Sequence, residues 1–137
     1  MASLKPEDIP SKMLSQDPFS QWLGIEIIEV KKGFCKLGMT IRRDMLNSMK
    51  KAHGGIAYAL ADTAFGFAAN THGKYAVSIE TSINHIEALQ ENDFIIAETQ
   101  LDINKHKLGF NYVNLSCNGK IVAIFKGIVY RTSKEWE

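Results

Sequence analysis

Hydrophobic residues follow two different periods along this chain, and the change of period separates its predicted elements. From 54 to 71 nearly every position is apolar or small, which is typical of a buried helix. Gly73 follows as a candidate C-cap glycine. After this helix, apolar and polar positions alternate with a period of two, as they do in strands that bury one face.

Strand signals occur on both sides of the helix. Two strands are predicted before it, over 25–31 and 34–42 with a turn at Lys32-Gly33, and four after it, over 77–85, 94–103, 110–117 and 121–131. Asn118-Gly119 joins the last two and is a strong hairpin signal. In the strand 77–85 the apolar face ends on His85, which we interpret as a core residue. A short amphipathic helix is predicted over 6–16, and Asp17-Pro18 should end it.

This order predicts an α+β fold in which an antiparallel sheet of five or six strands wraps around one long central helix. The helix is rich in alanine and glycine, so strands can approach it closely. We divide the chain into a helical or extended N-terminal segment, 1–20, and a domain, 21–137. A single sheet has open edges. Pairing two copies edge to edge would merge their sheets, so a homodimer or a dimer of dimers (a homotetramer) is expected.

Composition and charge exclude several classes of function. The 137 residues are 45% apolar and 23% charged, with a net charge of +1 and no basic block. Binding to nucleic acid through a broad electrostatic surface is therefore not expected. The N-terminus lacks the pattern of a secretory signal, and the apolar helix is shorter than the ~20 residues of a membrane span. We expect a cytoplasmic protein with no membrane partner.

Cysteine and histidine spacing narrows the chemistry further. Cys35 and Cys117 are far apart and neither belongs to a CxxC pair, which favours a reduced protein without a disulfide framework. The four histidines show no HxxxH or HxxEH spacing, so no metal site is expected. The chain also contains no GxSxG elbow and no P-loop.

Asp62 is the only ionisable carboxylate within the apolar helix. The residues three and four positions away on a helix are two aromatic residues, an alanine and a glycine, so no cation is available locally. Burying an unpaired carboxylate is costly or raises its pKa. A fold accepts this cost most readily where the acid does chemistry. The alternative is a structural acid that accepts hydrogen bonds from backbone or from a partner subunit.

His53, Gly54 and Gly55 stand at the start of the same helix. The first turn of a helix has free N–H groups and a partial positive charge, so an oxyanion is stabilised there by about 3–4 kcal/mol per donor. Asp62 lies about 12 Å further along the axis at ~1.5 Å per residue. This separation favours a site in which Gly54 of one subunit meets Asp62 of another. The alternative is that the triplet only shapes a helix start.

Asn47, the triplet at 53–55, the acid nine residues after the histidine and Ser78 in the next strand together resemble the hot-dog-fold acyl-CoA thioesterases of the phenylacetate-degradation (PaaI-like) group. The resemblance covers 22–131, including 60–65 and, more loosely, 122–127. It implies the hot-dog fold and hydrolysis of an acyl- or aryl-CoA thioester to a free acid and CoASH. It implies no cofactor beyond the CoA of the substrate.

The resemblance also implies a role for each matching residue. Asp62 is the general base or the nucleophile, and the Gly54 N–H polarises the thioester carbonyl. Asn47 orients water or substrate, Ser78 from the partner subunit holds the water, and His53 helps to shape the turn. For Asn47 an Asx-turn is the alternative, and for Ser78 an ordinary strand position.

Contacts with the CoA portion are less well defined. Relatives often carry an Arg-Pro step followed by Gly-Asp after the third strand, and this chain has neither over 86–93. We assign Gly55, Lys105 and Lys107 to CoA binding, with the two lysines near its phosphates. A solvated hairpin tip is the alternative for the lysines.

Two other functions compete with hydrolysis. The first is a non-catalytic acyl-CoA binding or sensing protein on the same fold. The second is a hot-dog dehydratase or hydratase, whose chemistry usually needs a histidine paired with a carboxylate. His53 is placed at the entrance of the helix, not beside Asp62, which disfavours this second alternative.

Overall fold

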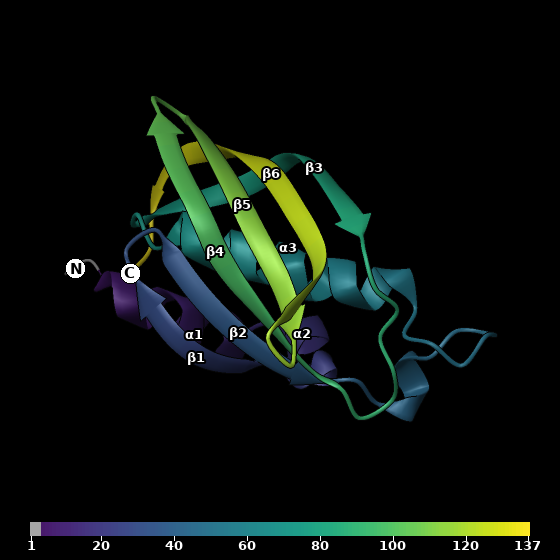
Figure 1. Cartoon of the computed structure of the whole chain (residues 1–137). Helices are drawn as coiled ribbons and strands as arrows, with labels where there is room; N and C mark the ends of the chain where they lie inside the picture. Colours follow the sequence, from purple (N-terminus) through teal and green to yellow (C-terminus); the bar gives the residue numbers. More distant parts are fainter. Residues whose placement is uncertain (1–3) are drawn as a thin grey trace.

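The computed structural model describes residues 4–137 as six antiparallel strands that curve around one long helix (Figure 1). The sheet order is β1-β2-β4-β5-β6-β3. The strands are β1 (Glu26–Lys31), β2 (Phe34–Thr40), β3 (Lys74–His85), β4 (Phe94–Lys105), β5 (Leu108–Cys117) and β6 (Lys120–Glu135). The predicted fold is confirmed, and β6 continues well past the predicted end of its segment.

The helix α3 (Gly54–Asn70) lies against one face of this sheet and forms the core with it. Phe65 and Phe67 are fully buried on the helix, and Phe125 meets the Phe65 ring from β6. Gly127 on β6 lets the helix approach, because a Cβ there would lie only 2.7 Å from the Phe65 ring. Packing between the helix and the sheet is therefore set by aromatic side chains that fill the space beside small residues.

The turn at Asn118-Gly119 forms as the sequence predicts, but the end of α3 differs from the prediction. Asn118 and Gly119 have φ values of 51° and 79°, as a type I′ hairpin turn requires. Gly73 is not the residue that ends α3. Thr71 is the C-cap and keeps right-handed backbone, while the left-handed Gly73 donates its N–H to the Asn70 carbonyl.

The N-terminal segment packs onto this unit as three short helices, η1 (Pro6–Asp8), α1 (Ile9–Ser15) and α2 (Pro18–Leu23). Asp17 ends the first run and caps α2, since its carboxylate accepts a hydrogen bond from the Ser20 N–H at 3.0 Å. Ile9 and Leu23 are fully buried. No helix within residues 4–137 combines the length and the apolar character that crossing a membrane requires.

Both end strands of the sheet, β1 and β3, leave one edge unpaired within residues 4–137. The β3 edge carries Val77 and Ile79, whose side chains are 54% and 59% exposed. A register shift between Ser78 and Glu80 interrupts the strict alternation of the strand. The predicted strand over 77–85 is confirmed as part of β3, but Val77 and Ile79 on its apolar face are exposed.

Candidate active site

The start of α3 presents one free backbone donor. His53 is the N-cap, and its Nδ1 accepts a hydrogen bond from the Gly55 N–H at 2.9 Å. Within residues 4–137 the Gly54 N–H has no hydrogen-bond acceptor. The N–H of Gly54 is therefore available to a ligand, whereas the N–H of Gly55 is used by the cap. His53 fixes the geometry of this turn.

Asn47 lies in the loop that leads to the helix and is itself part of a turn. Its Oδ1 accepts hydrogen bonds from the N–H groups of Met49 at 2.9 Å and Lys51 at 3.2 Å. This is the Asx-turn arrangement that the sequence allowed as an alternative. Only the Nδ2 group of Asn47 has no partner in the described part of the chain, so that nitrogen is the end able to meet water or substrate.

A hollow of about 320 Å³ lies in front of the helix start. Its polar lining includes Asn47, Lys51, His53, Gly54, His85 and Glu87. Leu89 and Val122 are among its apolar lining residues. Three residues predicted from the sequence for the reaction, Asn47, His53 and Gly54, therefore come together here in one chain.

His85 is a member of this hollow that sequence reasoning missed. We interpreted it as a core residue, and that interpretation is wrong, because its side chain is exposed. His85 is the last residue of β3 and lies opposite Gly54, which has no side chain to cover it. The available signal was the position of a histidine at a strand end, two residues beyond Ile83, which packs against the core.

Asp62 is half-buried near the middle of α3 and has no hydrogen-bond or ion-pair partner within residues 4–137. Burial raises the pKa of its carboxyl above the ordinary value because the charged form is desolvated. It is absent from the lining of the hollow at Gly54. Gly54 and Asp62 are both on α3, so the helical rise keeps them about 12 Å apart within one chain.

The face of α3 that carries Asp62 borders the open edge of the sheet. Tyr58, one turn earlier on the same face, forms a hydrogen bond through its hydroxyl with the Thr81 hydroxyl of β3. Gly66, one turn later, has open space beside it, since a Cβ there would meet no heavy atom within 4 Å. An approaching molecule at the β3 edge would therefore come close to Asp62.

The remaining predicted residues lie away from the hollow within one chain. Ser78 is exposed on β3 and pairs with Val129 of β6. Lys105 and Lys107 flank the β4–β5 turn, beside the end of α3 opposite to Gly54. Lys107 lies near Tyr130, with its Nζ 5.8 Å from the ring centre. A single chain does not bring these lysines to the Gly54 amide.

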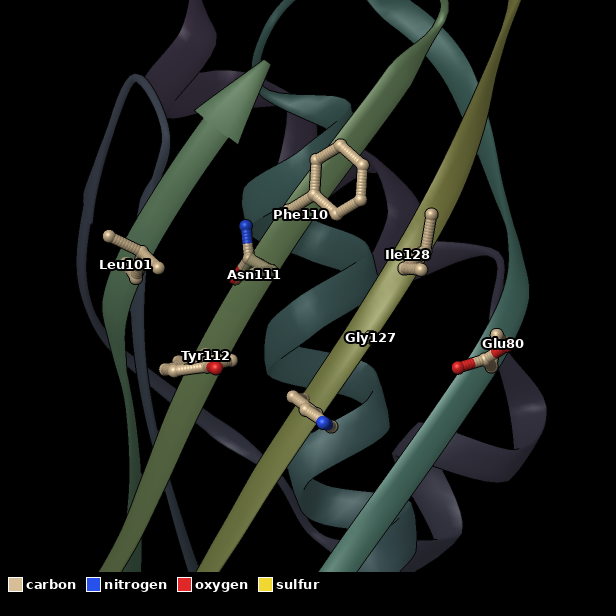
Figure 2. Close-up of a pocket in the computed structure, with 8 residues that line it drawn as sticks. Glu80, Leu101, Phe110, Asn111, Tyr112, Gly127 and Ile128 are labelled. Carbon is tan, nitrogen blue, oxygen red and sulfur yellow. The ribbon is translucent and has the colours of Figure 1, made fainter. Parts of the chain in front are cut away.

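Two further hollows flank the molecule. One, of about 400 Å³, lies on the other side of the helix start and is lined by Phe19, Trp22 and Gly55 among others. Another, of about 230 Å³, lies on the face of the sheet turned away from α3, with Phe110 and Tyr112 on its floor (Figure 2). Neither contains Asp62, Ser78 or the two lysines.

The cysteines do not form a reactive centre. Cys35 is buried between β1 and β4, and this burial raises the pKa of its thiol to about 12. Burial and the nearby Asp93 carboxylate also raise the pKa of Cys117. Both thiols therefore stay protonated near neutral pH. Within the described range 4–137, no three His, Cys, Asp or Glu side chains are grouped to hold a metal ion.

Comparisons with known proteins identify relatives of this chain. A family model described as "Thioesterase superfamily" matches residues 49–106. The acyl-coenzyme A thioesterase PaaI of Escherichia coli is 32% identical over 120 residues, covering 87% of this chain and 86% of its own length. A protein from Archaeoglobus fulgidus with the name "Putative esterase" is 35% identical over 133 residues, covering 95% of this chain and 85% of its own length.

Solved structures of related proteins have the same fold over most of this chain. The structure of E. coli PaaI has a TM-score of 0.91 with 30% identity and covers 95% of both chains. A mutant of PaaI from Thermus thermophilus has a TM-score of 0.81 with 32% identity, covering 85% of this chain and 100% of its own. With its six-stranded sheet around α3, this chain belongs to the thioesterase superfamily, as a PaaI-like thioesterase with the hot-dog fold.

Proposed function

We propose that this thioesterase hydrolyses an acyl- or aryl-CoA thioester to a free acid and CoASH, with Asp62 as general base or nucleophile. One observation carries the proposal. A half-buried carboxylate without an ion-pair or hydrogen-bond partner in residues 4–137 stands on the same helix whose first N–H, at Gly54, is free. The name of the E. coli relative, an acyl-coenzyme A thioesterase, supports CoA as the thiol.

The chemistry follows from these two groups. The Gly54 N–H, at the positive end of the α3 dipole, donates a hydrogen bond to the carbonyl oxygen as negative charge develops there. The Asp62 carboxylate either takes a proton from the attacking water or attacks the carbonyl carbon itself. The Asn47 Nδ2 group orients water or substrate, and the Ser78 hydroxyl holds the water. No cofactor takes part in this reaction.

Two copies of the chain complete each site in this proposal. The separation of Gly54 and Asp62 along α3 is too long for both to act on one carbonyl within one chain. Pairing of β3 edges would place Asp62 and Ser78 of the partner subunit at the hollow of the first. The exposed Val77 and Ile79 support this edge as the contact. Lys105 and Lys107 would then meet CoA phosphates only from the partner subunit.

Thiol release from a panel of short-chain, long-chain and aryl CoA esters tests the proposal. The wild-type chain should release CoASH from at least one of them. Asp62→Asn should lower kcat by about 10²–10⁴-fold, the usual contribution of a positioned base, while the KM of the best ester changes little. A wild-type protein that binds these esters and cleaves none would support a non-catalytic acyl-CoA binding protein instead.

A further inference from the structure

We propose that His85 is a second donor to the thioester carbonyl oxygen, so that its Nε2–H and the Gly54 N–H together form a two-donor oxyanion hole. This rests on the proposed function, since it assigns a further residue to the same reaction. His85 belongs to β3 and Gly54 to α3, so the hole would be made by two elements of one chain.

The position of the imidazole carries the inference. A Cβ on Gly54 would lie 3.5 Å from Nε2 and 3.7 Å from Cε1 of His85. Cα–Cβ bonds on a helix tilt toward its N-terminus, the direction in which the free N–H groups also point. The space left empty by the missing Gly54 side chain therefore lies in front of the free donor, and His85 forms one wall of it.

Neither the His85 ring nor the Gly54 N–H has another hydrogen-bond partner in the described chain. Within residues 4–137 no side chain or backbone group forms a hydrogen bond or an ion pair with the His85 ring, and none accepts from the Gly54 N–H. Unused donors at a surface are ordinary, but Gly54 and His85 line the same hollow of about 320 Å³, and Nε2 lies only 3.5 Å from the position of a Gly54 Cβ. An oxygen bound between these two residues could accept from both.

His85 donates to the same oxyanion whether Asp62 acts as general base or as nucleophile. A water oxygen or the Asp62 carboxylate of the partner subunit adds to the carbonyl carbon, and the C=O electron pair moves onto the oxygen. That oxyanion accepts hydrogen bonds from Gly54 and His85. The C=O bond then reforms as the C–S bond breaks. When water attacks, the sulfur leaves with the proton that Asp62 took from that water. When Asp62 attacks, the sulfur leaves as the thiolate, and water then cleaves the mixed anhydride, which frees the acid and Asp62 and supplies the proton of CoASH. His85 neither gains nor loses a proton.

Three variants test the inference on the acyl-CoA that the wild-type chain cleaves best. His85→Phe removes the donor and should lower kcat by about 10²-fold, the effect of losing one oxyanion donor, with little change in KM. His85→Gln carries an amide N–H near the place of Nε2 and should recover much of the loss. Glu87→Gln, in the same hollow but without a proposed role in the reaction, should stay within a few-fold of wild type.

Binding separates this role from simple contact with CoA. A thioether analogue of the same CoA ester has no carbonyl oxygen, so its Kd should be equal for wild type and His85→Phe by calorimetry. The inference is overturned if His85→Phe keeps wild-type kcat, if His85→Gln is as slow as His85→Phe, or if thioether binding weakens by the same factor as catalysis. A wild-type chain without hydrolysis would overturn the proposed function instead.

Discussion

At the scale of single residues, the site depends on groups left without partners. Asp62 has no cation, and Gly54 has no acceptor among residues 4–137. Folding gains nothing from either group, and the desolvated carboxylate opposes folding. The raised pKa of Asp62 is the measurable consequence of this cost. It also means that the carboxylate is a stronger base than an exposed one.

This cost predicts how stability depends on pH. Because burial raises the Asp62 pKa, the folded chain binds more protons than the unfolded chain between the ordinary value of about 3.9 and the raised value. Stability therefore falls as pH rises through this window. Asp62→Asn removes the charge, so its Tm should exceed that of wild type at pH 7, and the gain should shrink toward pH 4.

Thermal unfolding of both proteins across this pH range checks the prediction. Glu91→Gln, which neutralises an exposed carboxylate, is the matched control and should leave Tm unchanged at each pH. A variant Asp62→Asn that is less stable than wild type at pH 7 would mean that the carboxylate stabilises the fold.

At the scale of elements, periodicity predicted most of the fold because the strands from β2 to β6 pack against the same helix, α3. The hairpin at Asn118-Gly119 was predictable since only two left-handed residues fit its turn. The end of α3 was not, because Thr71 ends it with a right-handed cap. His85 was misassigned because alternation gives the direction of a side chain but not what covers it. His85 lies opposite Gly54, which has no side chain to cover the imidazole.

The contact between α3 and β6 is the element-scale feature most sensitive to one added atom. Gly127→Ala would place a Cβ 2.7 Å from the ring of Phe65, which is 1% exposed. Overpacking of this kind costs about 1–3 kcal/mol, measured as the free energy of unfolding in urea. Phe65→Leu frees space at the contact, so the double variant should lose less than the sum of both single variants. Additive losses would contradict this.

At the scale of the whole molecule, the two residues that we propose to act on the thioester carbonyl, Gly54 and Asp62, lie on one helix, about 12 Å apart. That separation was predictable from the sequence, because it follows from eight residues of helical rise. The arrangement of a partner subunit was not, because periodicity within one chain does not define contacts between chains. The open β3 edge, with Val77 and Ile79 exposed, is the surface that fits such a partner.

Disrupting this edge should lower both the mass of the protein in solution and the rate of thioester hydrolysis. Ile79→Lys places a charge on the β3 edge, so we expect a smaller solution mass by light scattering and a loss of thioester hydrolysis of about tenfold or more, with unchanged circular dichroism. Ile28→Lys, on the β1 edge and 46% exposed, is the matched control and should keep both mass and activity. Full activity in a monomeric Ile79→Lys protein would contradict a shared site.

Subunit complementation tests the shared site most directly. Gly54→Ala adds a methyl group beside the free N–H, in the space in front of His85, and Asp62→Asn removes the carboxylate, so we expect each homodimer to be inactive. The two chains are co-expressed with different affinity tags, and the mixed dimer is purified through both. If Gly54 and Asp62 of opposite subunits form each site, one of the two sites in a mixed dimer is intact, and CoASH release should return to about half of the wild-type rate. A mixed dimer no more active than its parents would place both residues in one chain's site and contradict a site shared between subunits.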